Sequence, residues 1–501
     1  MRYVLCERKG QIEFAPDSSV PHDEQAVAFH QLPPFTTPPY CPQTTAIHAE
    51  LQRVLSGKQL LLSELPYSLQ TLHEQYQRGC IAFEQSIRQH GPRHFQCLRC
   101  GNEQFLLFAK LTCFQCKEHD CVYCRKCLMM GRVAQCMPLL RWIGPPFPYP
   151  SIKQALQWQG KLTPAQQKAS DHLRSLVSTG GELLLWAVCG AGKTEVLFSG
   201  IARALELQQR ICLASPRKDV ILELLPRFQA AFPTVTIAGL YGGCKAQEEN
   251  AQLILATTHQ LFRFKEAFDL LIIDEVDAFP YSYDETLEKA VYKAKKQAAL
   301  LVYLSATPSR ALQRKAEQKK MNAIYIPLRY HGHPLPLPRF QWCGHWKRLL
   351  YKKKLPKPLQ HWLIKQLESG RQAFLFVPSV TVLQEIVPLL KSIDSTIEGV
   401  FAEDPHRHEK VMAFRNGAIK VIVTTTILER GVTIPFTDVA VLGAEEKIFC
   451  ESALVQIAGR AGRSSEDPSG DVCFFHYGKS NAMQSAQYHL IKMNQRGRHL
   501  T

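Results

Sequence analysis

The chain has 501 residues, too many for one hydrophobic core, so it should divide into two to four domains. Its composition, 46% hydrophobic and 21% charged, is typical of a globular protein, and no apolar run approaches the roughly 18 residues of a membrane helix. The net charge of +16 favours a polyanion partner, nucleic acid before anionic lipid, although a merely basic enzyme would share it.

Residues 1–90 suggest no chemistry, and their role stays open. The N-terminus lacks the apolar core of a signal peptide, so we expect a cytoplasmic protein. Prolines between 33 and 42 indicate an extended segment, and the apolar spacing from Ile47 to Ile87 predicts helix.

The next segment, residues 91–135, is rich in cysteine and is predicted to be a zinc-binding module. Its seven cysteines are Cys97, Cys100, Cys113, Cys116, Cys121, Cys124 and Cys127. A C-x-x-C pair directs two thiolates at one tetrahedral Zn²⁺, and inside a cell such spacing indicates metal rather than disulfides.

The pairing of these cysteines stays open. One arrangement combines Cys97/Cys100 with Cys124/Cys127 and leaves Cys113, Cys116 and Cys121 for a second ion, with His119 as a further ligand. Another combines Cys97/Cys100 with Cys113/Cys116, and an iron–sulfur cluster is a third alternative.

Basic and aromatic residues alternate with the cysteines, which suits contact with single-stranded nucleic acid, although a zinc fold that stabilises its neighbours is an equally ordinary role. These residues are Arg93, His94, Phe95, Arg99, Tyr123, Arg125, Lys126 and Arg132. We expect a separately folded DNA grip, followed by a proline-rich linker over 136–158.

A phosphate-binding loop follows the apolar strand expected at 183–188. The sequence from 189 to 194, CGAGKT, places two glycines where backbone N–H groups must face an anion, and a helix should begin just after it. Lys193 is suited to the β- and γ-phosphates of ATP, and Thr194 to Mg²⁺.

Ala187 stands where the full pattern of such a loop, G-x-x-x-x-G-K-[ST], has its first glycine. Upstream, Gln166 follows a Thr163-Pro164 helix start and could read an adenine edge. The predicted nucleotide-binding residues are Gln166, Gly190, Ala191, Gly192, Lys193 and Thr194.

Strands and helices then alternate in two series, which predicts an α/β protein with two doubly wound parallel sheets. The first series, 159–330, has strands expected near 183–188, 211–215, 253–257, 270–274 and 300–305. A proline-rich break opens a linker at 331–355. The second series, 356–501, has strands expected near 373–377, 397–401, 420–425, 438–443 and 471–476.

Four further motifs carry chemistry. Asp274 and Glu275 end an apolar strand, where Asp274 would hold Mg²⁺ and Glu275 would orient the attacking water. Ser305-Ala306-Thr307 ends the next strand, and residues 424–433 (TTTILERGVT) offer hydroxyls for a nucleic-acid backbone. Arg460 and Arg463, spaced one turn apart after Gln456 on an expected helix, are suited to gripping a γ-phosphate.

In this order the motifs resemble those of superfamily 2 helicases over roughly residues 160–480. The resemblance implies two tandem RecA-like domains, and it adds candidate DNA contacts at Arg217, Thr258, His259 and Thr425. The implied catalytic residues are Lys193, Asp274, Glu275, Gln456, Arg460 and Arg463.

The cysteines ahead of the helicase motifs make the chain more similar to the late competence protein ComFA family. That resemblance implies an ATP-driven motor on single-stranded DNA at the inner face of the membrane. It would work beside the ComEC uptake channel and other competence proteins, with ATP, Mg²⁺ and Zn²⁺ as cofactors. One alternative is a PriA-like replication-restart helicase, whose zinc cysteines lie inside the core instead. Another is a zinc-containing DNA-binding scaffold with a vestigial ATPase.

Overall fold

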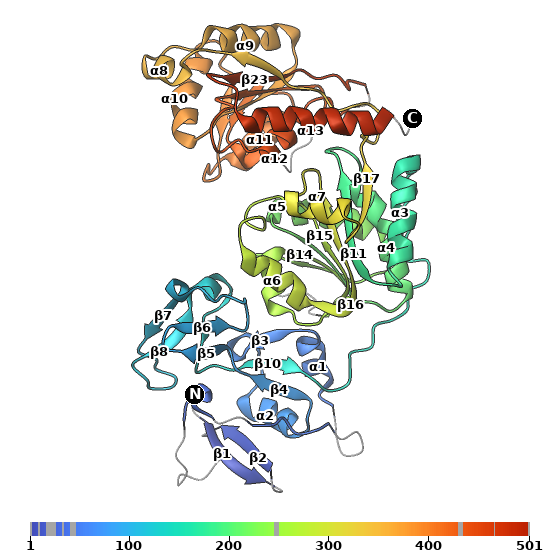
Figure 1. Cartoon of the computed structure of the whole chain (residues 1–501), viewed down its shortest axis with the longest axis vertical. Helices are drawn as coiled ribbons and strands as arrows, with labels where there is room; N and C mark the ends of the chain where they lie inside the picture. The colour runs from blue at the N-terminus through green and yellow to red at the C-terminus, as the bar shows by residue number, and fades with distance from the viewer. Residues whose placement is uncertain are drawn as a thin grey trace. The chain divides into compact units, whose positions relative to one another are not determined.

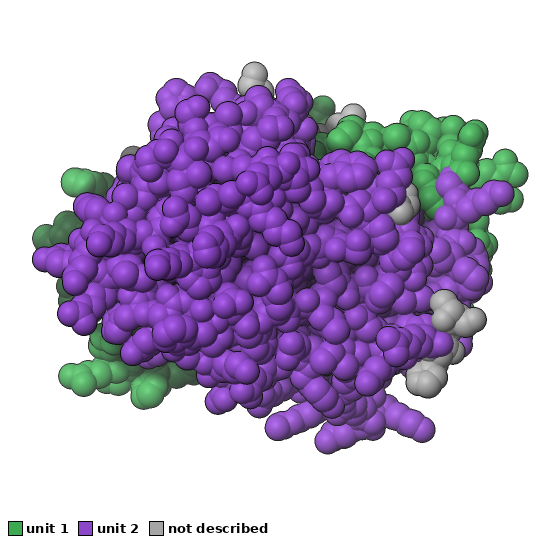
Figure 2. Space-filling view, turned by 90° about the horizontal axis from the view of Figure 1, so that it is seen from above, with its two compact units in different colours: residues 1–159, 173–182, 198–303 green, residues 160–172, 183–197, 304–501 purple. Residues whose placement is uncertain are grey.

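The computed structural model describes residues 3–8, 11–16, 27–32, 35–40, 47–244, 250–428, 434–464 and 466–498. Figure 2 distinguishes two compact units, one of residues 1–159, 173–182 and 198–303, the other of residues 160–172, 183–197 and 304–501. Within these described ranges, no helix combines the length and apolar character needed to cross a bilayer.

The N-terminal region begins with the hairpin of β1 (Tyr3–Arg8) and β2 (Gln11–Pro16) and continues into a small antiparallel sheet. That sheet has the order β3 (Gln59–Leu61), β10 (Leu139–Trp142), β4 (Ile81–Glu84). Helices α1 (Ala49–Leu55) and α2 (Leu69–Gln77) bury Leu51, Leu72 and Tyr76 against it. Two expectations are therefore wrong. Strands β3 and β4 interrupt the helix expected over 47–87. Strand β10 lies inside the segment predicted to be a proline-rich linker, 136–158.

Short antiparallel strands support the cysteine-rich segment (Figure 1). Strands β5 (Ile87–Gly91) and β6 (His94–Cys97) form a hairpin. Strands β7 (Phe108–Leu111), β8 (Cys121–Cys124) and β9 (Val133–Ala134) form a second sheet, and the 3₁₀ helix η5 (Arg125–Met130) follows β8. The cysteines thus sit at strand ends and in the adjoining turns.

The first α/β domain has a seven-stranded sheet in the order β13 (Ile237–Leu240), β14 (Leu253–Thr257), β12 (Ile211–Ser215), β15 (Phe268–Ile273), β16 (Lys295–Ser305), β11 (Gly181–Ala187), β17 (Asn322–Ile326). The pairs β13–β14, β14–β12, β12–β15, β15–β16 and β11–β17 are parallel. Both faces of the central strands are buried, which explains their continuous apolar sequences. The sequence analysis missed β13 and β17.

The α-helices described in this domain are α3 (Pro164–Leu176), α4 (Lys193–Glu206), α5 (Lys218–Ala231), α6 (Glu285–Ala294) and α7 (Arg310–Glu317). The 3₁₀ helix η6 (Thr258–Arg263) directly follows β14.

The second α/β domain has a six-stranded parallel sheet in the order β18 (Arg339–Trp342), β23 (Val472–His476), β22 (Thr437–Leu442), β19 (Gln372–Phe376), β21 (Val421–Thr424), β20 (Glu398–Val400). Its helices are α8 (Trp346–Tyr351), α9 (Lys357–Ser369), α10 (Val380–Lys391), α11 (Arg407–Arg415), α12 (Glu451–Ala458) and α13 (Asn481–Arg498). Strand β18 and helix α8 lie within the predicted linker. Two tandem α/β domains with parallel sheets confirm the predicted fold class.

Candidate nucleotide site and cysteine clusters

The loop between β11 and α4 has the geometry of a phosphate cradle. Strand β11 ends at Ala187, and α4 begins at Lys193, so the helix N-terminus with its free N–H groups opens onto the loop. Gly190 and Gly192 adopt φ of +79° and +66°, a region that favours glycine. The strand, loop and helix predicted from the sequence are therefore present.

Gln166 holds this loop through its side chain. Its Nε2 donates to the carbonyl of Ala191 at 2.7 Å, and its Oε1 accepts from the N–H of Thr163 at 2.7 Å. A Cβ on Gly192 would lie 2.5 Å from that Nε2, so the amide would have to shift for any larger residue. These two hydrogen bonds show that Gln166 holds the loop in place, and its contact with an adenine stays a prediction.

The acidic pair follows β15 directly. Asp274 accepts the N–H of Glu275 through Oδ1 at 2.9 Å. Glu275 itself adopts φ of +54°, a conformation that costs a non-glycine residue on the order of 1 kcal/mol and that clusters at functional sites. After the next strand, Ser305 Oγ accepts the N–H of Thr307 at 3.0 Å, which closes the small hydroxyl turn.

The arginine motif lies at the end of α12. The expected continuous helix is wrong here, because α12 stops at Ala458 and Gly459 is its C-cap, so Arg460 and Arg463 follow in a turn. Gln456 accepts a hydrogen bond from the thiol of Cys189, in the phosphate loop, at 2.9 Å. Gly459 packs against the same cysteine, where a Cβ would lie 2.6 Å from that of Cys189.

Arg329 is a buried residue at this place that the sequence analysis missed. Its guanidinium donates to the carbonyls of Gly462 and Gly459, and its side chain lies beneath Gly190. Burial, with the charge of Arg463 as a second cause, lowers the pKa of Arg329 to about 10. No local pattern marks Arg329, because its partners lie more than a hundred residues further along the chain.

The candidate DNA contacts differ in accessibility. Arg217 is the N-cap residue of α5, and Thr425 is half-buried after β21. Thr258 is fully buried in η6, so its side chain does not reach the surface, whereas its neighbour His259 is half-buried. Burial lowers the pKa of His259. Residues 429–433 of the predicted hydroxyl motif lie outside the described residues.

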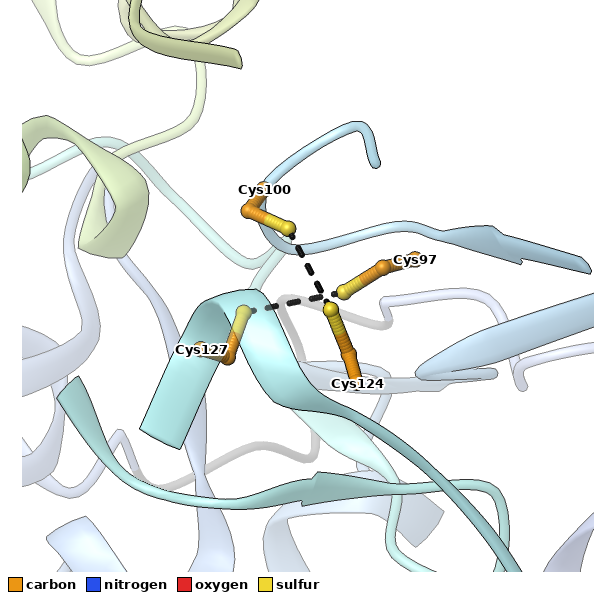
Figure 3. Close-up of side chains that lie close together, drawn as sticks. All are labelled: Cys97, Cys100, Cys124 and Cys127. Carbon is orange, nitrogen blue, oxygen red and sulfur yellow. Dashed lines mark hydrogen bonds between the residues drawn. The ribbon is translucent and has the colours of Figure 1, made fainter. Parts of the chain in front are cut away.

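The cysteines form two groups of four. The first cysteine cluster is Cys97, Cys100, Cys124 and Cys127; the second is Cys113, Cys116, Cys121 and Cys136. Figure 3 shows the four side chains of the first cluster converging from two loops, with Sγ–Sγ separations of 3.8 Å (Cys97–Cys127) and 3.7 Å (Cys100–Cys124). In the second, Cys113 and Cys136 are 3.7 Å apart.

These distances suit zinc. Four thiolates at about 2.3 Å from a tetrahedral Zn²⁺ lie about 3.8 Å from one another. All eight cysteines are buried, and Lys293, which bonds the Arg99 carbonyl between Cys97 and Cys100, can offset part of the negative charge of a zinc–thiolate centre in the first cluster. The first of the two pairings left open by the sequence is the one observed. Cys136 takes the place considered for His119, and the sequence analysis missed it because it lacks a C-x-x-C partner.

Comparisons with known proteins agree with this architecture. Residues 159–310 match the model of the type III restriction enzyme res subunit, and residues 355–465 match the helicase conserved C-terminal domain. Together with the phosphate loop, acidic pair and arginine motif, they define a helicase-type ATPase of superfamily 2, a class that uses ATP and Mg²⁺.

Residues 43–141 match the competence protein ComFA N-terminal domain. The chain is 46% identical over 454 residues to competence protein ComFA of Bacillus subtilis, covering 90% of this chain and 97% of that protein. It is 38% identical to competence protein ComFA of Streptococcus pneumoniae, covering 74% and 85%. The chain therefore belongs to the ComFA family of competence proteins. A solved structure of yeast Dbp5 bound to RNA and ADP BeF3 matches 67% of this chain and 91% of its own, with 16% identity and a TM-score of 0.46.

Proposed function

We propose that this protein is an ATP-driven translocase that moves single-stranded DNA during uptake in natural competence. The observation that carries the proposal is the ordered series of helicase-type motifs, with the phosphate loop and acidic pair at strand ends and the arginine motif after α12, in a chain of the ComFA family. Lys193 and Thr194 at the start of α4, and Asp274 and Glu275 after β15, are the residue types that phosphoryl transfer needs.

In this proposal each motif has a separate task. Lys193 faces the β- and γ-phosphates, Thr194 and Asp274 hold Mg²⁺, and Glu275 orients the attacking water. ATP supplies the phosphoryl group and Mg²⁺ neutralises its developing charge. Arg460 and Arg463 stabilise that charge, and Gln456 links their turn to the phosphate loop through Cys189. Arg217, His259 and Thr425 contact the strand.

Zinc completes the proposed cofactor set. The two cysteine clusters each take one Zn²⁺ with four thiolates, as their sulfur spacing supports. The protein works at the inner face of the membrane beside the ComEC channel, with other competence proteins. A net charge of +16 suits both the DNA strand and an anionic membrane surface.

Steady-state ATP hydrolysis with and without single-stranded DNA tests the proposal. We expect DNA to raise the turnover rate, with Lys193→Ala inactive under both conditions. Rates that do not change with DNA would contradict a DNA motor and favour the scaffold alternative. Efficient separation of forked duplexes would favour a PriA-like helicase instead.

A further inference from the structure

Lys293 connects the first cysteine cluster to the ATPase fold. From the last turn of α6, its ammonium donates to Gln59 Oε1 at 3.1 Å, to the Arg99 carbonyl at 2.6 Å and to the Phe262 carbonyl at 2.8 Å. A lysine has three N–H donors, so all three are used. Arg99 lies between the ligands Cys97 and Cys100, and Phe262 lies in η6. One side chain thus joins the cysteine loop, η6 and α6.

Two more lysines fasten the same loops along α6. Lys126, between Cys124 and Cys127, pairs with Asp284 at 2.7 Å, and Asp284 is the N-cap residue of α6. Lys289 donates to the Gly101 carbonyl at 3.0 Å, next to Cys100. Both C-x-x-C loops of the cluster are therefore attached to the helix, at its N-terminus and along its length.

A second route leads from the cluster to η6 through Glu64. Arg99 is fully buried, and its Nη2 lies 2.8 Å from each carboxylate oxygen of Glu64. Arg263, the last residue of η6, lies 2.9 Å from the same carboxylate. Two arginines thus share one glutamate, so a displacement of the cysteine loop disturbs the end of η6.

The charges of these groups match a metal centre. One Zn²⁺ with four thiolates carries a net charge of −2, since 2 − 4 = −2. Arg99 is paired with Glu64 and Lys126 with Asp284, so Lys293 is the cation that can offset part of this charge. Groups that bond the loops of metal ligands fix the ligand geometry and commonly change metal affinity by roughly 10- to 100-fold when they are removed.

We propose that the first cysteine cluster, when it holds zinc, stabilises the neighbouring part of the ATPase fold and so acts as a zinc-dependent clamp. Lys293 is the positioning residue that connects the cluster to η6 and α6. The clamp holds η6, which carries the proposed DNA contact His259, and α6, which follows the acidic pair. The sequence analysis instead expected a separately folded DNA-binding module, in which the loss of zinc would disturb residues 91–135 alone. The contact of His259 with DNA rests on the proposed function, whereas the clamp itself does not.

The test compares Lys293→Met with Lys295→Met. Lys295 is a suitable control because its ammonium lies over the Tyr292 ring, 6.0 Å from the centroid, instead of against the cluster. Hydrogen–deuterium exchange is measured on the full chain, before and after zinc is removed with a chelator. We expect zinc removal to speed exchange in residues 258–264 and 285–294 of the parent and the control. In Lys293→Met, residues 258–264 should exchange fast even with zinc bound.

Zinc affinity gives a second readout, measured by competition with a chromophoric chelator. Lys293→Met should bind the zinc of the first cluster roughly 10-fold more weakly than the control. If Lys293→Met does not fold, Lys289→Met, whose side chain is partly exposed, serves in the same two measurements and should accelerate exchange in 285–294.

Exchange that rises only within residues 91–135 after zinc removal would overturn the proposal, as would a Lys293→Met protein that matches the control in both readouts. Neither measurement uses ATP or DNA. A failure of the proposed translocase would appear in the hydrolysis assay alone and would leave these results unaffected.

Discussion

At the scale of single residues, Glu275 combines a strained backbone with the proposed role of orienting the attacking water. Glu275→Gln keeps the size of the side chain and its left-handed conformation but cannot accept a proton from water. We expect ATP binding near that of the parent and hydrolysis slower by roughly 10²–10⁴-fold, with DNA held more tightly. Nucleotide titration and single-turnover hydrolysis measure the two effects. An equal loss of ATP binding would contradict the assigned role.

Lys193 offers a complementary test of the phosphate loop. Lys193→Ala removes the positive charge at the start of α4, so DNA-stimulated hydrolysis should disappear. Lys320→Ala, at an exposed surface position, is the matched control and should hydrolyse ATP at the parent rate. If Lys193→Ala also turns over near the parent rate, the nucleotide binds elsewhere.

Arg329 shows what the sequence cannot reveal at this scale. The phosphate loop was predictable because all of its determinants lie within a few consecutive residues. Arg329 acquires its role only from carbonyls at Gly459 and Gly462, brought close by the fold. Arg329→Met should lower the free energy of unfolding by roughly 1–3 kcal/mol, because buried carbonyls lose their donor. Urea unfolding measures this change; a variant as stable as the parent would contradict it.

At the scale of elements, the second cysteine cluster makes a stoichiometric prediction. The parent should contain two zinc ions per chain, and Cys136→Ser should contain one, because three thiolates hold the second ion poorly. Cys244→Ser, in which the cysteine lies outside both clusters, and His119→Ala should each keep two. Metal analysis of the purified proteins gives the counts. Two ions in Cys136→Ser and one in His119→Ala would restore the histidine alternative.

A side-chain pair, Glu451 of α12 and His489 of α13, joins these two helices and makes the stability of the fold depend on pH. The Nδ1 of His489 lies 3.2 Å from Glu451, and its Nε2 lies 3.1 Å from the Ala306 carbonyl. The hydrogen bond from His489 lowers the pKa of Glu451 below its ordinary 4.5. The resulting stability is present above that value and is lost as the pH falls through the lower, folded-state pKa.

Glu451→Gln removes this titration. Unfolding free energies measured from neutral pH down to about pH 3 should therefore fall less steeply for the variant than for the parent in the acidic range. Parallel curves for the two proteins would show that the pair contributes nothing to acid sensitivity.

Element prediction succeeded for most apolar strands of the two parallel sheets, and it failed for short or partly buried strands such as β3 and β4, which lie where a helix was expected. Buried parallel strands such as β12 and β15 have continuous apolar sequences that are visible without a structure. Strand β18, only partly buried, and β10, which follows a cysteine-rich segment but pairs with β3 and β4, lack that signal. Helix α12 ends at Ala458 with Gly459 as its C-cap residue, which the spacing of Arg460 and Arg463 alone did not indicate.

At the scale of the whole molecule, the proposed clamp ties the first cysteine cluster to the ATPase fold. The C-x-x-C loops of the first cluster bond α6 directly, so metal loss should affect more than a peripheral module. Binding to single strands should weaken steeply with salt, because phosphate contacts release counterions. The double variant with Cys97→Ser and Cys100→Ser should lose the zinc of the first cluster and keep that of the second. It should bind strands more weakly, with a shallower salt slope if the first cluster itself contacts phosphates.

The central claim is movement along single-stranded DNA, and the dependence of ATP hydrolysis on strand length tests it most directly. A translocase hydrolyses ATP for as long as it travels, so turnover at saturating DNA ends should rise with the length of an unstructured oligonucleotide and then level off. Glu275→Gln should show no such rise. Hydrolysis that is stimulated equally by short and long strands would contradict translocation and leave a DNA-activated ATPase that does not move.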